Sequence, residues 1–126
     1  MVRIKGHTDQ PRTALAAGDI FFYPLRRGHY GTAENALIEA MSLGLVPVVL
    51  DNPAEAAIVE DGETGIVAFS MSAAVRAVAR LIHSPAERRR LSRNAAAFAR
   101  TRSPYTSARQ FADLWRSMVA KERAVA

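Results

Sequence analysis

The residues that could do chemistry gather in one short stretch of this 126-residue chain, between Arg26 and Glu39. Gly28, Gly31 and Thr32 lie in a predicted loop that runs into a predicted helix, and glycine lets a backbone approach a ligand closely. The free N–H groups at the start of such a helix attract phosphate. The stretch therefore predicts a phosphate-binding loop. It holds neither a G-x-G-x-x-G motif nor a P-loop, however, and an ordinary turn is the alternative interpretation.

Two titratable side chains belong to the same stretch. His29 could contact a phosphate or a sugar, or it could be a loop histidine without a function. Glu39 lies opposite the apolar stripe of its predicted helix, a position that by itself indicates a solvated side chain. The three histidines of the chain show no metal-ligand spacing, and the absence of cysteine excludes disulfides, thiolate catalysis and cysteine-based zinc sites. We therefore expect neither a metal nor a cofactor.

The first half of the chain, residues 1–70, alternates predicted strands with predicted helices. Continuous apolar runs at 19–24 and 45–50 are typical of strands buried on both faces, as in parallel sheets. Shorter strands are predicted at 2–5 and 64–69, and helices at 8–17, from about 33 to 43, and at 53–59. Because parallel strands are joined by right-handed helical crossovers, this order predicts an α/β fold with a partial Rossmann-like parallel sheet of about four strands.

Residues 71–126 predict helices only, and we expect them to form a C-terminal helical tail. These helices are expected at 72–83, from Pro85 onward and from about Ser103, with the last six residues frayed. The run Ser84-Pro85-Ala86-Glu87 matches a capping box with proline at the first helical position, and Asn52–Glu55 matches a similar helix start. The last helix carries an apolar stripe, made by Phe111, Leu114, Trp115, Met118 and Val119.

Composition and charge limit the class of protein. The chain has 49% apolar residues and no apolar run near the roughly 18 residues that span a bilayer, so one soluble domain is expected. Its start lacks a signal-peptide core, which makes the cytoplasm the default compartment. Residues 1–70 carry 5 Lys and Arg against 9 Asp and Glu, whereas residues 71–126 carry 12 against 3. The basic half could contact an anionic membrane or nucleic acid, although solvated helix faces are the simpler explanation.

One stretch of the chain resembles a known family. Residues 31–67, GTAENALIEAMSLGLVPVVLDNPAEAAIVEDGETGIV, resemble the C-terminal, nucleotide-sugar-binding domain of GT-B glycosyltransferases of family four, the glycosyl transferases group 1 family. The likeness rests on Leu37–Met41 followed by a glycine, on the Val-Pro-Val-Val strand, and on Glu60–Val67. It extends to about residues 2–120 through the segments 2–7 and 17–24 and the aromatic Tyr105.

The resemblance implies roles for particular residues. The family signature is a glutamate, seven residues and a second glutamate, and the second, which accepts hydrogen bonds from the ribose hydroxyls of the nucleotide, matches Glu39. The first, which contacts the donor sugar, would stand at position 31, where this chain has Gly31. Glu34 lies nearby and is the candidate replacement for the first glutamate, but about 140° around a helix separates it from Glu39, which makes it a poor substitute unless the helix starts later. The backbone of Gly31 and Thr32 resembles the turn that approaches the donor's sugar and diphosphate.

The resemblance also implies a function. We expect residues 1–126 to be a single, incomplete GT-B C-terminal domain, which in a retaining, metal-independent transferase would bind a nucleotide diphosphate sugar whose sugar passes to an unknown acceptor. The arginine and lysine that neutralise the donor's diphosphate, and the N-terminal domain that holds the acceptor, have no counterpart here. The chain should therefore bind the donor weakly, be inactive alone, and need a missing N-terminal domain or a partner chain. The alternative is a non-enzymatic interaction module that uses its Arg-rich helices on a membrane surface, nucleic acid or protein partner.

An incomplete sheet also predicts self-association. Without the strands that would flank it, the strand at 19–24 exposes an apolar edge, and such edges pair with other chains. Residues 2–5 could cover this edge within one chain, or two chains could pair to form a homo-oligomer.

Overall fold

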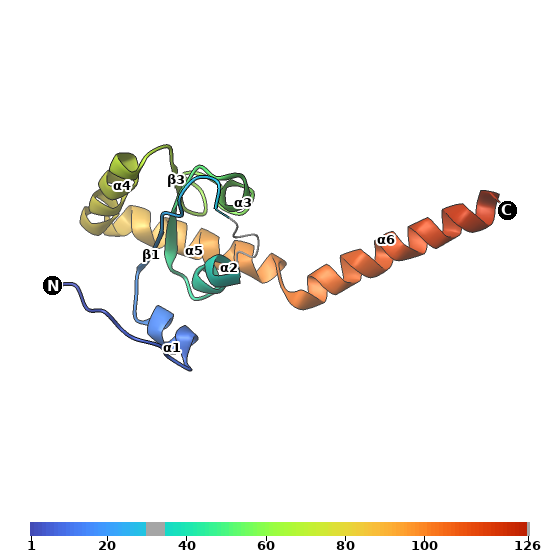
Figure 1. Ribbon diagram of the computed structural model, residues 1–126, viewed down its shortest axis with the longest axis horizontal. Coiled ribbons are helices and arrows are strands. Elements are labelled where there is room, and N and C mark those ends of the chain that lie inside the picture. Colours follow the sequence, from blue (N-terminus) through green and yellow to red (C-terminus); the bar gives the residue numbers. More distant parts are fainter. Residues whose placement is uncertain (30–34, 126) are drawn as a thin grey trace.

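The fold is built on a small parallel sheet. The computed structural model describes residues 1–29 and 35–125 (Figure 1). Three strands, β1 (Ile20–Tyr23), β2 (Val46–Leu50) and β3 (Ile66–Ala68), lie in the order β1-β2-β3, with Ile20 opposite Val46 and Val48 opposite Ile66. All neighbours are parallel, so the carboxyl ends of the strands meet at one edge. The predicted α/β class is confirmed, with three strands in the described residues instead of about four.

The strand predicted at residues 2–5 is wrong. Residues 1–8 have no regular secondary structure, and the side chains of Val2 and Ile4 are at least 90% exposed. Arg3 and Lys5 alternate with these two apolar residues, so pairing this short segment with the sheet would bury little apolar surface.

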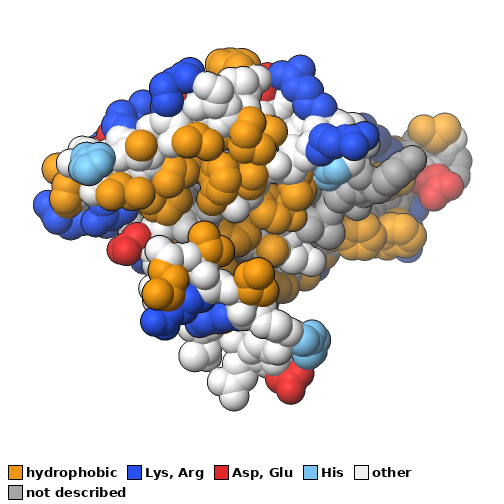
Figure 2. All heavy atoms as spheres, turned by 60° about the vertical axis from the view of Figure 1, so that its left-hand side comes forward, with side chains coloured by type: hydrophobic (Ala, Val, Ile, Leu, Met, Phe, Trp, Pro, Cys, Tyr) orange, Lys and Arg blue, Asp and Glu red, His pale blue; other side chains and the backbone are white. Residues whose placement is uncertain are grey.

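Among the described residues, β1 therefore forms an edge of the sheet. Phe22 is 42% exposed, which contradicts the prediction that this strand is buried on both faces. Val75 and Ile82 of the neighbouring helix α4 (Met71–His83) are also exposed. Figure 2 shows hydrophobic side chains gathered on the side of the molecule that carries α4 and β1. Self-association through this edge stays a prediction.

Helices cover both faces of the sheet. Alternate residues of a strand point to opposite sides, and one side of β2, with Val46 and Val48, packs in a cluster with Leu81 of α4. The other side, with Val49, packs with Leu37 of α2 (Asn35–Ser42) and Ala95 of α5 (Pro85–Thr101). The predicted C-terminal helical region is confirmed, and its first two helices, α4 and α5, also form part of the core.

Two short helices border the ends of strands. The first, α1 (Pro11–Ala16), leads into the start of β1, and α3 (Pro53–Ala56) follows β2 (Figure 1). Each begins at a proline, which suits the first turn because its missing N–H would have no partner there. Both are shorter than the predicted helices at 8–17 and 53–59.

The last helix, α6 (Pro104–Val125), projects away from the rest of the molecule (Figure 1). The predicted stripe lies along it, and Phe111, Leu114, Trp115 and Met118 are all exposed. The helix continues to Val125, so the predicted fraying of the last six residues is wrong for those that the structure describes. No helix within the described ranges has both the length and the apolar character needed to cross a membrane.

The predicted capping box at Ser84 is also wrong. Within the described residues, the Ser84 side chain caps no N–H group, and Glu87 instead pairs with Arg80, whose Nε lies 3.3 Å from Oε2. An ion pair between neighbouring helices thus replaces the local bond. A serine cap is found one helix earlier, where the Ser70 hydroxyl accepts a hydrogen bond from the Ala73 N–H at 3.1 Å.

Candidate ligand site at the carboxyl end of the sheet

A cavity opens where two neighbouring strands end. It has a volume of about 300 Å³ and is lined by Gly28 and His29 from the loop after β1, and by Asn52, Pro53 and Ala54 after β2. Parallel sheets bind their ligands at this edge, because the loops that follow the strands carry polar groups there. The position of the cavity makes it the candidate functional site.

The loop after β1 is held in place by the residues after β2. The side-chain amide of Asn52, which is buried, donates a hydrogen bond to the carbonyl oxygen of Leu25 at 2.9 Å. The His29 N–H donates to the Arg26 carbonyl at 3.3 Å, and Gly28 between them has a φ of +72°, which favours glycine. Asn52 was predicted as a helix cap, but among the described residues its side chain caps no N–H group and fixes this loop instead.

His29 lies against a buried carboxylate. Its Nε2 is 2.8 Å from Oε1 of Glu55, and Glu55 is fully buried whereas the His29 side chain is 17% exposed. The two atoms are close enough for an ion pair, but neither oxygen of Glu55 accepts an aligned hydrogen bond from the described part of the chain. A buried carboxylate is costly unless a positive group compensates it. The contact with His29 is therefore central to how this site is built.

Glu39 lies on α2 and is only partly exposed. Its side chain is 29% exposed, and Oε1 lies 3.4 Å from a guanidinium nitrogen of Arg12 on α1. Its position opposite the apolar stripe predicted a solvated residue, whereas the structure places this partly exposed carboxylate against Arg12 of α1. The other predicted donor-binding residues, Gly31, Thr32 and Glu34, lie outside the described residues.

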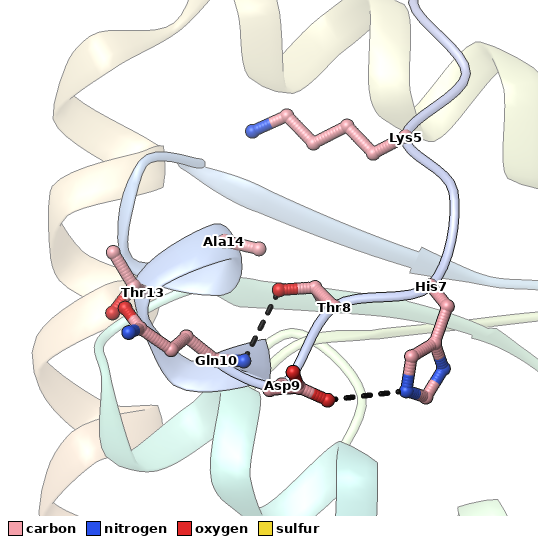
Figure 3. Close-up of a pocket in the computed structure, with 7 residues that line it drawn as sticks. All are labelled: Lys5, His7, Thr8, Asp9, Gln10, Thr13 and Ala14. Atoms are coloured by element: carbon pink, nitrogen blue, oxygen red, sulfur yellow. Dashed lines mark hydrogen bonds and ion pairs between the residues drawn. The ribbon is translucent and has the colours of Figure 1, made fainter.

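A second hollow, of about 460 Å³, is formed by the N-terminal segment and α1 (Figure 3). Its side chains include His7 and Asp9, which approach within 3.3 Å of each other and are almost fully exposed. The helix α1, which lines this hollow, leads into the start of β1 (Figure 1). The polar side chains of this hollow are exposed to water, which weakens their contacts with a ligand. We therefore favour the cavity at the carboxyl ends of the strands as the candidate site. The described residues also contain no cluster of three or more His, Cys, Asp or Glu that could hold a metal ion.

Sequence reasoning missed the role of Glu55. The pattern from Asn52 to Glu55 matches a helix start so well that the acid was interpreted as a first-turn residue. One signal was present in the sequence. Asn52 and Glu55 follow one buried strand closely, and the loop with His29 follows the other. Neighbouring parallel strands end at the same edge of the sheet, so the segments that follow them come together.

The sheet and its helices define the class as a Rossmann-like α/β domain, with a cavity at the carboxyl ends of its strands. A family model described as glycosyl transferases group 1 matches residues 1–98, and the chain belongs to this family. The resemblance of residues 31–67 is thus confirmed, and membership supports a function in glycosyl transfer. No curated protein matches the chain.

Proposed function

We propose that this chain is part of the donor-binding domain of a GT-B glycosyltransferase and that it binds the nucleoside diphosphate of a nucleotide sugar. The observation that carries the proposal is the partly exposed carboxylate of Glu39. By the resemblance, this residue matches the second glutamate in the signature of the family to which the chain belongs. The same resemblance supports a reaction that retains configuration at the sugar and passes it to an acceptor held by another domain or chain.

The chemistry of Glu39 suits a ribose. A carboxylate has two oxygens, which can accept hydrogen bonds from two neighbouring hydroxyl groups at once. The contact with Arg12 is long, and the Arg12 side chain is mostly exposed, so a nucleotide can displace it at little cost.

Glu39→Ala should weaken binding of uridine or guanosine diphosphate by about tenfold, because it removes charge-assisted hydrogen bonds to the ribose. We expect the wild-type chain to bind with a Kd of about 1 mM. NMR titration measures both values. The matched control is Glu63→Ala, which removes an exposed carboxylate paired with Arg90 and should leave the affinity unchanged. Equal affinities of wild type and Glu39→Ala would contradict the role of Glu39.

The 126-residue chain on its own should transfer no sugar. The described residues supply only part of a donor site. Much of the rate acceleration in group transfer comes from holding both substrates close together in the correct orientation. Release of nucleoside diphosphate from a nucleotide sugar, followed by a coupled assay, measures this. Turnover that Glu39→Ala abolishes would show that the chain is catalytically sufficient.

A second candidate is a non-enzymatic interaction module, favoured by α6, whose aromatic stripe is exposed along a projecting helix. Such a module has no need to bind nucleotide. The Glu39→Ala titration therefore separates the two candidates.

A further inference from the structure

The buried Glu55 needs a positive partner, and its surroundings show which one. The side chain has no exposed surface, and His29 Nε2 is 2.8 Å away. An imidazole that carries both protons is a cation with two N–H donors. A buried pair of opposite charges is far less costly than a lone buried carboxylate, so the contact is satisfied when the ring is protonated.

The loop that presents His29 is basic. It contains Arg26, Arg27 and His29, and both arginine side chains are exposed. His29 also lines the 300 Å³ cavity, together with Gly28. The loop is tied down twice, by Asn52 at Leu25 and by Glu55 at His29. A fixed cationic loop beside a cavity is a chemical match for a phosphate group.

We propose that Glu55 is a positioning residue that holds His29 as an imidazolium at the mouth of the cavity, and that Arg26, Arg27 and His29 together bind the diphosphate of the ligand. The identity of that ligand rests on the proposed function. The His29–Glu55 pair is neutral as a whole, so the arginines supply the net positive charge and the ring supplies a fixed N–H donor.

The test has two readouts on the intact chain at pH 7. The first is the ¹⁵N NMR signal of the His29 ring, which distinguishes imidazolium from neutral imidazole. We expect imidazolium in the wild type and neutral imidazole in Glu55→Gln, which keeps the shape of the side chain and removes its charge. The second is the Kd for inorganic pyrophosphate. It should rise about tenfold in Glu55→Gln, in His29→Gln, and in the double variant Arg26→Gln/Arg27→Gln.

Two control variants make the same kinds of substitution, histidine or arginine to glutamine, away from the cavity. His7→Gln removes an almost fully exposed histidine that pairs with Asp9 at 3.3 Å, and Arg89→Gln removes an exposed arginine of α5. Both should leave pyrophosphate affinity unchanged. A neutral His29 ring in the wild type, or an affinity that Glu55→Gln and His29→Gln do not change, would overturn the proposal. If Glu55→Gln does not fold, as judged by circular dichroism, the His29→Gln affinity and the wild-type ring signal decide.

This test is separate from that of the proposed function, because pyrophosphate has no ribose. Pyrophosphate binding that depends on His29, without a gain in affinity from the nucleoside, would support the loop and contradict nucleotide binding. Nucleotide binding that depends on Glu39 but not on His29 would do the reverse.

Discussion

Gly65→Ala should lower the free energy of unfolding by about 3 kcal/mol, the largest effect of a single methyl group that we expect in this chain. A Cβ atom at Gly65 would lie 2.5 Å from Cγ of Pro47, 2.6 Å from the Pro47 carbonyl oxygen and 2.8 Å from Cγ1 of Val59. The Pro47 carbonyl belongs to β2, the central strand, so it cannot move without disturbing the pairing on either side. Gly65 directly precedes β3, and its lack of a side chain lets the two strands approach.

Thermal unfolding followed by circular dichroism measures this effect, and we expect a fall in Tm of about 10 °C. Gly6→Ala is the matched control, because a Cβ there would meet no atom within 4 Å. It should leave Tm within about 2 °C of the wild type. A Gly65→Ala variant as stable as Gly6→Ala would show that β2 and the segment before β3 are not packed as described.

Leu81→Ala should also destabilise the fold by about 3 kcal/mol. Leu81 is fully buried on α4, in the cluster that includes Val48 and Leu91. Removing three carbon atoms there leaves a cavity that surrounding side chains fill only in part. The loss would weaken the whole face of the sheet on which α4 packs.

The next residue on the same helix provides the control. Ile82 is 58% exposed, so Ile82→Ala should cost under about 1 kcal/mol, although it too replaces a large apolar residue by alanine. Chemical denaturation with urea measures both variants. Equal losses at the two positions would mean that α4 is rotated relative to the sheet, or that a partner covers Ile82.

The sequence predicted the parts of the fold that depend on long apolar runs. The strands at 20–23 and 46–50 lie inside such runs, and the parallel sheet follows from the helices between them. The strand predicted at 2–5 does not form because pairing it with the sheet would bury too little apolar surface to offset the loss of solvation of its polar groups. The capping box at Ser84 failed because a local pattern does not show that Arg80, from the preceding helix, competes for Glu87.

The candidate site was only partly predictable. The loop with His29 and the helix with Glu39 were identified from residue types and from the family signature. The partnership of His29 with Glu55 was not, because the two residues are far apart in the sequence and meet only when β1 and β2 lie side by side. Burial of a carboxylate is a property of the folded chain, and no spacing rule shows it.

The most direct test of the account is an NMR map of the backbone amides that shift when uridine diphosphate is added to about 10 mM, several times the expected Kd. We predict that the shifts will concentrate at residues 25–29 and 52–55, around the carboxyl ends of β1 and β2, and at residues 35–39 of α2. Shifts confined to the hollow beside α1 or to α6, or no saturable shifts at all, would contradict nucleotide binding at this site.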